Sequence, residues 1–237
     1  MVTFARAEHR AVATALRAMD HGLLMTHRCW FGGGTEIVLD LGEYRVSKDV
    51  DFLCADIAGY RGLRSLVAAR GAAALFAAPI REERAFRSDQ YGIRGIVSAD
   101  GVPLRFEIVR EARISLDGRP DPGLGVPRLV HADRIAEKLL ANADRSEDRS
   151  TAFRDAADLG MLALRGGPFP GCAFAKAEEA YGDDIGRKLA RVLERLSQPA
   201  ERRDAAAALG MDAPLLEAAA HALAGEVLRL RPGWIPA

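Results

Sequence analysis

The apolar positions of this 237-residue chain mix strand and helix spacings in the first half and keep to helix spacing in the second. Apolar residues three and four positions apart predict an amphipathic helix, whereas alternation predicts a strand with one buried face. In the first half we therefore expect helices and strands to follow one another and to end in a hairpin with an Asp100-Gly101 turn. The expected helices cover residues 12–19, 35–41 and 61–67, and the expected strands cover residues 28–31, 49–52, 92–98 and 102–109.

The second half has a simpler pattern. Between residues 117 and 127, glycine and proline recur closely, which predicts a turn-rich linker. After this linker the apolar spacing is helical throughout, and we expect six helices, at residues 132–143, 151–164, 174–181, 185–196, 200–209 and 214–228. We therefore predict an α+β protein, with an amino-terminal mixed sheet and its helices over residues 1–127 and a carboxy-terminal helical domain over residues 128–237.

Composition excludes several classes of protein. A hydrophobic fraction of 49% and a formal net charge of zero are typical of a soluble globular protein. No apolar run is long enough to cross a membrane, and charged residues interrupt the beginning of the chain, so we expect neither a membrane contact nor a secretory signal. The three cysteines, Cys29, Cys54 and Cys172, are far apart and form no C-x-x-C pair, which excludes a disulfide framework or zinc site and predicts a cytoplasmic location.

A glycine turn followed one helix later by two carboxylates is the first sign of chemistry. The turn is Gly32-Gly33-Gly34-Thr35, and the carboxylates are Asp49 and Asp51. Glycines let the backbone approach phosphates closely, and Thr35 can cap the helix that starts there, whose free N–H groups favour an anion. On a strand the two aspartates share one face, about 6 to 7 Å apart, where they can bind Mg²⁺. Each motif alone is more often an ordinary turn or a pair of solvated acids, but together they predict metal-dependent nucleotide chemistry.

A third acid stands on the second strand of the expected hairpin. Alternation places Glu107 on one face, together with Arg105, and Phe106 and Ile108 on the other. An acid on a central strand is costly to bury unless it meets a cation. Glu107 is therefore either a third site residue or an acid of an edge strand in solvent.

Four blocks of the sequence together resemble a known family. Residues 31–35 and 44–52 match a G-G-T followed by an arginine and S-x-D-x-D-F, residues 137–141 match E-K-x-x-A, and residues 154–159 match R-D-x-x-D-L. In this order they resemble the AbiEii/AbiGii-type nucleotidyltransferase toxins of the polymerase-beta-like nucleotidyltransferase superfamily. The last 70 or so residues carry no recognisable motif, although a chain of this length can form two domains.

The resemblance implies an enzyme, a nucleotidyltransferase that uses Mg²⁺ or Mn²⁺. It would move a nucleoside monophosphate from an NTP to an acceptor hydroxyl and release pyrophosphate. The resemblance implies that Asp49, Asp51 and Glu107 bind the metal, with Glu107 acting either as a ligand or as the base that removes the acceptor proton. The family more often has an aspartate at the third position, so Glu107 departs from its pattern.

The resemblance also assigns residues to the nucleotide. It implies catalytic roles for Lys138, which would contact the triphosphate, and for Asp155. The predicted division into two domains suggests that the nucleotide lies between them. Taken without the family, Lys138 can equally extend to solvent, and Asp155 and Asp158, three apart on a helix, can pair with Arg149 or Arg154. The residues that it assigns to nucleotide binding are Gly33, Gly34, Thr35, Arg45, Ser47, Lys48 and Asp158.

For the acceptor the resemblance implies tRNA or another RNA, and for the protein the toxin half of a bacterial toxin–antitoxin or abortive-infection pair with a cognate antitoxin. A basic stripe formed by Arg187, Arg191 and Arg195 fits the phosphates of RNA or an acidic partner, although such stripes are often only solvated. Two other functions stay open: an antibiotic-type nucleotidyltransferase acting on a small hydroxyl compound, and a catalytically degenerate domain that binds a nucleotide without turnover.

Overall fold

The computed structural model describes residues 3–235, which fall into two compact units. Within the described residues, one unit is formed by residues 3–39 with Ser47–Val130, and the other by Asp40–Val46 with residues 131–235. A sheet with its helices occupies the first unit and helices make up the second, so the predicted α+β class is confirmed. The short segment Asp40–Val46, although it lies within the first half of the sequence, packs with the helical unit.

The first unit is built on a mixed sheet with the strand order β3-β4-β5-β2-β1-β7-β6 among the described residues. The two strands at its centre, β2 and β5, run parallel, and β1 lies antiparallel to β2 on the other side. The predicted hairpin is present as β4 and β5. The strands are β1 (Cys29–Gly32), β2 (Val50–Cys54), β3 (Arg81–Ser88), β4 (Gly92–Ala99), β5 (Val102–Arg110), β6 (Gly118–Asp121) and β7 (Val126–Leu129).

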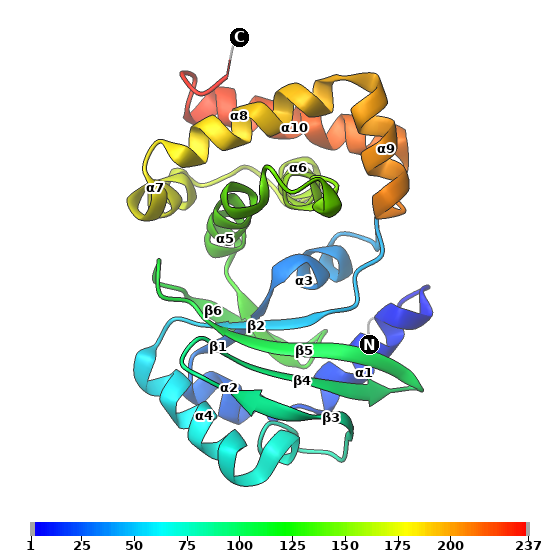
Figure 1. Cartoon of the computed structure of the whole chain (residues 1–237), viewed down its shortest axis with the longest axis vertical. Helices are drawn as coiled ribbons and strands as arrows, with labels where there is room; N and C mark the ends of the chain where they lie inside the picture. Colours follow the sequence, from blue (N-terminus) through cyan, green and yellow to red (C-terminus); the bar gives the residue numbers. More distant parts are fainter. Residues whose placement is uncertain (1–2, 236–237) are drawn as a thin grey trace. The chain divides into compact units, whose positions relative to one another are not determined.

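One face of this sheet carries the hydrophobic core. Phe31, Phe52 and Phe106 project from β1, β2 and β5. The ring centroids of Phe31 and Phe52 are 5.4 Å apart, and those of Phe52 and Phe106 are 5.9 Å apart. Buried residues of α1, α2 and α4 cover these rings, and Figure 1 shows the three helices beneath the sheet with α3 above it. The helices of this unit are α1 (Ala7–Ala18), α2 (His21–Thr26), α3 (Gly33–Asp40), α4 (Ile57–Arg70) and the 3-10 turn η1 (Gly71–Ala74). The face opposite the core is therefore free to carry polar side chains.

The expected linker at residues 117–127 is wrong. It contains β6 and the start of β7, which pair with each other, while β7 also pairs in parallel with β1 through Phe31 and Arg128. The glycines and prolines do form a turn, in which the Asp121 carboxylate accepts hydrogen bonds from the N–H groups of Gly123 and Leu124. Each strand has only four residues and one proline, so the local pattern resembles a linker even though distant pairing makes it a sheet edge.

Helices make up the second unit, as expected from the apolar spacing. The structure has α5 (His131–Arg145), η2 (Arg149–Thr151), α6 (Arg154–Arg165), α7 (Gly171–Tyr181), α8 (Asp184–Ser197), α9 (Pro199–Leu209) and α10 (Ala213–Leu230). In Figure 1, α5 and α6 lie beneath a layer that contains α8 and α10. The close approach of α6 and α10 depends on Gly160, because a Cβ atom there would lie 2.6 Å from the carbonyl oxygen of Ala219.

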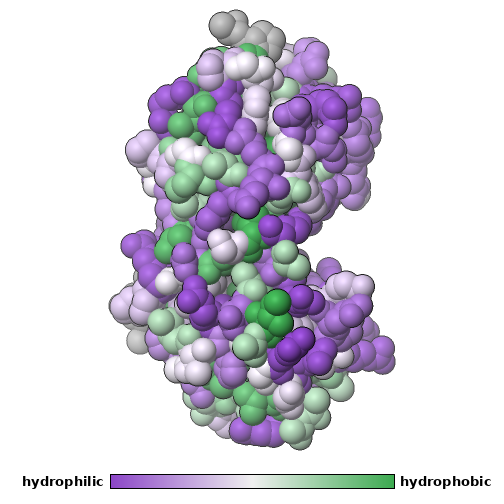
Figure 2. Space-filling view, turned by 90° about the vertical axis from the view of Figure 1, so that its left-hand side faces the viewer, coloured by the Kyte–Doolittle hydropathy of each residue, from purple (hydrophilic) through white to green (hydrophobic). Residues whose placement is uncertain are grey.

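The face of the molecule seen in Figure 2 is mixed in character, with hydrophilic and hydrophobic residues side by side and no continuous apolar band on that face. None of the helices found in residues 3–235 is both long enough and apolar enough to span a bilayer.

Candidate functional site

Two predicted site residues lie next to each other on the sheet face opposite the core. Asp51 on β2 is the direct neighbour of Glu107 on the parallel strand β5, and both are half-buried. Neighbouring strands are about 4.8 Å apart, and paired residues point to the same face. The expectation that Glu107 belongs to a central strand is therefore confirmed, since β5 lies between β4 and β2. Asp49 immediately precedes β2, which begins at Val50, so the predicted strand geometry applies to Asp51 but not to Asp49.

The glycine turn lies directly against Asp51. Gly33 has a φ of +74°, and a Cβ atom on it would lie 3.0 Å from Asp51 Oδ2. Only glycine adopts this conformation without strain and leaves room for the carboxylate. α3 begins at Gly33 itself, followed by Gly34, so the backbone turns from β1 into the helix beside the acid.

The structure contradicts the expected capping role of Thr35. This residue is the third of α3 rather than the residue before it, because the helix starts two positions earlier than the sequence pattern suggests. Its buried hydroxyl lies 2.7 Å from the hydroxyl of Ser47 instead. The backbone N–H of Ser47 in turn donates to His9 Nε2 over 3.3 Å. Two predicted nucleotide-binding hydroxyls are thus brought together across 12 positions of sequence, while the nearby Lys48 is exposed.

Glu107 already has a cationic partner, which the sequence analysis did not identify. Arg94, opposite Glu107 on β4, donates from Nε to Glu107 Oε1 over 2.6 Å. The same guanidinium also reaches Asp89 Oδ2 at 3.4 Å. The hairpin register could have identified this pair, because a turn at Asp100-Gly101 puts Arg94 directly opposite Glu107 on the neighbouring strand.

Asp51 and Glu107 fit a magnesium site in which the protein supplies few of the ligands. Within residues 3–235 no group of three histidine, cysteine, aspartate or glutamate side chains is close enough together to hold a metal by itself. Mg²⁺ in nucleotide enzymes is commonly bound by one or two carboxylates, with substrate phosphates and waters as the other ligands. The adjacent Asp51 and Glu107, which we call the acidic pair, meet that requirement, whereas a fully protein-bound ion such as Ca²⁺ would need more ligands.

The other predicted site residues belong to the second unit, where they form a buried ionic cluster. Asp158 accepts two hydrogen bonds from Arg45, 2.7 Å from Nε to Oδ1 and 2.8 Å from Nη2 to Oδ2. Lys138 Nζ lies 2.7 Å from Asp158 Oδ2 and 3.0 Å from Asp155 Oδ1. Arg145 pairs with the other oxygen of Asp155 at 2.8 Å. The alternative pairing of these aspartates with Arg149 or Arg154 is therefore not what the structure has.

The cluster keeps its groups charged despite their burial. Burial raises the pKa of Asp158, but Arg45 and Lys138 outweigh this effect and hold the pKa well below its ordinary value. Burial lowers the pKa of Lys138, yet Asp158 and Asp155 together raise it above the usual lysine value. The pKa of Asp155 is lowered in the same way, against the effect of burial, by Lys138 and then Arg145. We call Arg45, Lys138, Arg145, Asp155 and Asp158 the ionic cluster.

Tyr44 joins this cluster and was not among the predicted site residues. Its hydroxyl donates to Asp158 Oδ1 over 2.6 Å, and burial followed by the Asp158 charge raises the pKa of Tyr44 well above its ordinary value. Together Tyr44 and Arg45 fix the segment Asp40–Val46 to α6 of the helical unit. No local pattern indicates this role, because the partners are more than 100 positions apart.

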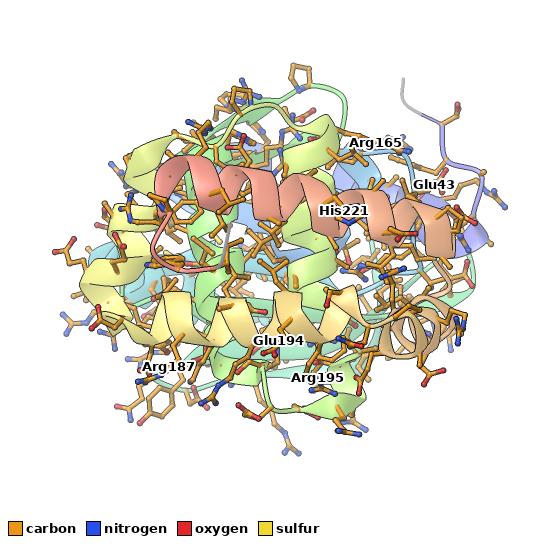
Figure 3. All side chains as sticks on the ribbon, turned by 90° about the horizontal axis from the view of Figure 1, so that it is seen from above. Glu43, Arg165, Arg187, Glu194, Arg195 and His221 are labelled. Carbon is orange, nitrogen blue, oxygen red and sulfur yellow. The ribbon has the colours of Figure 1, made fainter. Side chains whose placement is uncertain are left out.

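The basic stripe on α8 is neutralised by acids. Arg187 pairs with Asp184, Arg191 with Glu147 at 3.1 Å, and Arg195 with Glu201 at 2.7 Å. Figure 3 shows Arg187 and Arg195 along the same side of this helix. Because each guanidinium already has a carboxylate partner, the stripe offers little uncompensated charge to RNA phosphates.

Comparison with known proteins gives a family match over most of the chain. The family model described as nucleotidyl transferase AbiEii toxin, type IV toxin–antitoxin system, matches residues 17–225. Searches of curated proteins and of solved structures each gave no match. The matched range includes the glycine turn, the acidic pair and the whole ionic cluster. The chain therefore belongs to the family of nucleotidyl transferase AbiEii toxins of type IV toxin–antitoxin systems.

Proposed function

We propose that the protein transfers a nucleoside monophosphate from an NTP to an acceptor hydroxyl in a reaction that requires Mg²⁺ or Mn²⁺. The acceptor oxygen attacks the α-phosphorus, the bond from that phosphorus to the bridging oxygen breaks, and pyrophosphate leaves. The observation that carries the proposal is the position of Asp51 and Glu107, side by side on parallel strands with the Gly33 turn against Asp51.

In this proposal the first unit holds the reacting groups. Asp49 and Asp51 would bind the metal, which supplies positive charge to the triphosphate and its leaving group. Glu107 would either complete the ligand set or take the proton of the acceptor hydroxyl. The backbone at Gly33 and Gly34 and the paired hydroxyls of Thr35 and Ser47 support phosphate binding, since they offer a close approach and hydrogen-bond donors in one place. Lys48, exposed on the same segment, would add charge.

The ionic cluster supports a positioning role in the second unit. Arg45 stands two residues before Ser47 and four before Asp49 in the sequence, so Asp158, which fixes Arg45, also restrains the segment that carries these residues. Lys138 would contact the triphosphate from this cluster. Asp155 and Asp158 take two of the three N–H donors of its ammonium group, so a phosphate would have to bind through the third.

Family membership supports a cognate antitoxin as a partner, and we propose tRNA or another RNA in the cytoplasm as the acceptor. The test is to incubate the protein with each α-labelled NTP in turn, with Mg²⁺ or Mn²⁺, and with either tRNA or an aminoglycoside as acceptor. We expect label on tRNA with release of pyrophosphate. Label on the aminoglycoside alone would replace RNA by a small hydroxyl compound as the acceptor.

A pair of matched variants makes this test specific to the acidic pair. Asp51→Asn should abolish transfer, and Asp117→Asn, the same change at an acid exposed on the first unit, should leave it intact. Tight NTP binding without pyrophosphate release under any metal condition would favour a degenerate nucleotide-binding domain and reject the proposed reaction.

A further inference from the structure

A surface cavity of about 200 Å³ lies in the first unit, away from the acidic pair. It is located where the parallel strands β2 and β5 end, since Arg110 is the last residue of β5 and pairs with Cys54, the last residue of β2. Its lining is formed by Ile57, Tyr60, Arg61, Arg64, Gln90 and Arg110. We call it the arginine cavity.

The three arginines of this cavity lack the partners that the other basic groups of the protein have. Within residues 3–235, Arg61, Arg64 and Arg110 form no ion pair with a carboxylate. By contrast, Arg187, Arg191 and Arg195 on α8 are each paired. Three guanidinium groups around one cavity repel one another unless an anion lies between them.

The acids that stand nearest in sequence to the cavity residues are engaged elsewhere. Asp56 caps α4 by accepting the N–H of Gly59, and Glu111 pairs with Arg113 at 2.6 Å. Asp89 accepts the N–H groups of Tyr91 and Gly92 at 2.7 and 2.9 Å, and its charge also acts on Arg64 and Arg94. Asp89 therefore compensates part of the Arg64 charge, while Arg61 and Arg110 keep positive charge available to a ligand. Guanidinium groups recognise phosphate oxygens especially well.

The size of the cavity indicates how much of that ligand it can hold. Pockets that enclose small organic ligands usually have about 300 to 1,000 Å³, so this one holds a phosphate group but does not enclose a whole nucleotide. Apolar and aromatic surface lies beside it, since Ile57 is 49% exposed and Tyr91, which follows Gln90, is 64% exposed. Tyr91 is close to Arg110, because its carbonyl oxygen accepts the N–H of Arg110 over 2.9 Å.

We propose that the arginine cavity binds a backbone phosphate of a single-stranded nucleic acid, with an adjoining base against Tyr91 or Ile57. Arginine-lined sites beside exposed aromatic rings are the usual way in which proteins hold unpaired strands without reading their sequence. Arg110 lies three positions after Glu107 along β5, which is about 10 Å of strand. Alternation turns Arg110 to the face opposite Glu107, so the strand would be held at the end of β5 rather than among the carboxylates.

The test is direct binding of a fluorescently labelled oligouridylate of about 12 nucleotides, measured by fluorescence anisotropy at about 0.15 M salt. The triple variant Arg61→Gln, Arg64→Gln, Arg110→Gln should bind at least about tenfold more weakly than the unmodified protein and should show a smaller dependence of affinity on salt. Inorganic phosphate and UMP at the oligonucleotide concentration should not displace the strand, because a single phosphate lacks the contacts outside the cavity.

A matched control removes the same charge from paired arginines. The variant Arg187→Gln, Arg191→Gln, Arg229→Gln changes three exposed arginines that have carboxylate partners, and it should bind within about twofold of the unmodified protein. Circular dichroism would confirm that both triple variants are folded. Equal loss in the two variants, or no loss in the cavity variant, would overturn the proposal, as would tight binding of UMP alone that the cavity variant loses.

Binding is measured without NTP, so its result is separate from that of the transfer reaction. Asp51→Asn should bind the oligonucleotide as the unmodified protein does, because Asp51 is not part of the arginine cavity. Loss of transfer with intact binding would reject only the proposed reaction, whereas intact transfer to a small compound with no strand binding would reject only the cavity.

Discussion

Replacing Asp158 by asparagine should destabilise the protein more than any other single conservative change in the ionic cluster. The carboxylate is fully buried, pairs with both Arg45 and Lys138, and accepts the hydroxyl of Tyr44. Asparagine keeps the size but removes the charge and turns an N–H₂ group toward donors. The two cations then stay buried with a neutral partner, which is the costly way to break such a pair.

The expected magnitude follows from this geometry. Removing one partner of a buried ion pair costs about 3 to 5 kcal/mol of unfolding free energy. For a protein of this size each kcal/mol lowers the melting temperature by about 2 to 4 °C, so Asp158→Asn should melt roughly 6 to 20 °C below the unmodified protein. The assay is thermal unfolding, monitored by far-UV circular dichroism.

Asp184→Asn is the matched control for this prediction. Asp184 is also in the helical unit and also pairs with two cations, Arg187 and Lys188, but its side chain is 42% exposed. Exposed pairs contribute about 1 kcal/mol or less, so this variant should melt within a few degrees of the unmodified protein. If the two variants melted together, the cluster would not stabilise the fold in the way argued.

The pH profile is a second readout of the same cluster. The pKa values of Asp155 and Asp158 are lower in the folded protein than the ordinary value, so the unfolded chain binds protons first as the pH falls. Stability from these groups is therefore complete above about pH 4 and is lost progressively below it. The raised pKa of Lys138 has the opposite sign, and its contribution is complete below about pH 10 and declines above it. In Asp158→Asn the loss at acid pH should be smaller.

Three further predictions concern single positions. Gly33→Ala should lower the free energy of unfolding by about 1 to 2 kcal/mol because of the positive φ, and it should strongly reduce transfer because the added Cβ meets Asp51. Gly101→Ala, which has a similar φ but open space around it, should lower stability alone; thermal melting and initial transfer rates would separate the two effects. Arg94→Gln should lower the Mg²⁺ concentration for half-maximal transfer several-fold by releasing Glu107, and an unchanged metal titration would exclude Glu107 as a ligand. Gly160→Ala should lower the free energy of unfolding, measured by denaturant titration, by about 1 to 3 kcal/mol, because it overpacks α6 against Ala219. Gly225→Ala, whose Cβ would meet no atom within 4 Å, should be neutral or stabilising in the same measurement.

The helices of the second unit were predictable because their signal is local. Apolar spacing placed helices at 185–196 and 200–209, and the structure has them at Asp184–Ser197 and Pro199–Leu209. Each helix buries one stripe of side chains, so the helical spacing of apolar residues recurs in every turn of the helix. The hairpin of β4 and β5 was predictable for a similar reason, since alternation and an Asp-Gly turn are both short-range features.

The edges of the sheet were not predictable in the same way. β3 is exposed and charged along most of its length, and β6 contains a proline, so neither shows the alternation that a half-buried strand requires. These strands exist because of hydrogen bonds to β4 and β7, which local propensity does not report. The start of α3 was missed because Gly33 and Gly34 favour a turn in isolation.

The candidate site shows the same division. Alternation within a single strand indicated which residues share a face with Asp51 and which share a face with Glu107. That the two acids lie on the same face of the sheet follows from the parallel register of β2 and β5, which the sequence pattern does not report. The partners of these residues depend on tertiary contacts instead. Arg94 meets Glu107 across a hairpin, and Tyr44 meets Asp158 over more than 100 positions. Family resemblance identified Arg45, Lys138, Asp155 and Asp158 one by one, but it identified neither Arg145 nor the fact that these residues pair with each other.

Basic residues show most clearly why partners matter more than spacing. The stripe on α8 has the regular spacing of an RNA-binding helix, yet its arginines are paired with acids. Arg61, Arg64 and Arg110 form no pattern in the sequence, because two of them are on α4 and the third ends β5. The parallel pairing of β2 with β5 brings them to one cavity, where they form no ion pairs among the described residues. Affinity for phosphates depends on charge that is not already neutralised, so a net charge of zero is compatible with a strongly basic site.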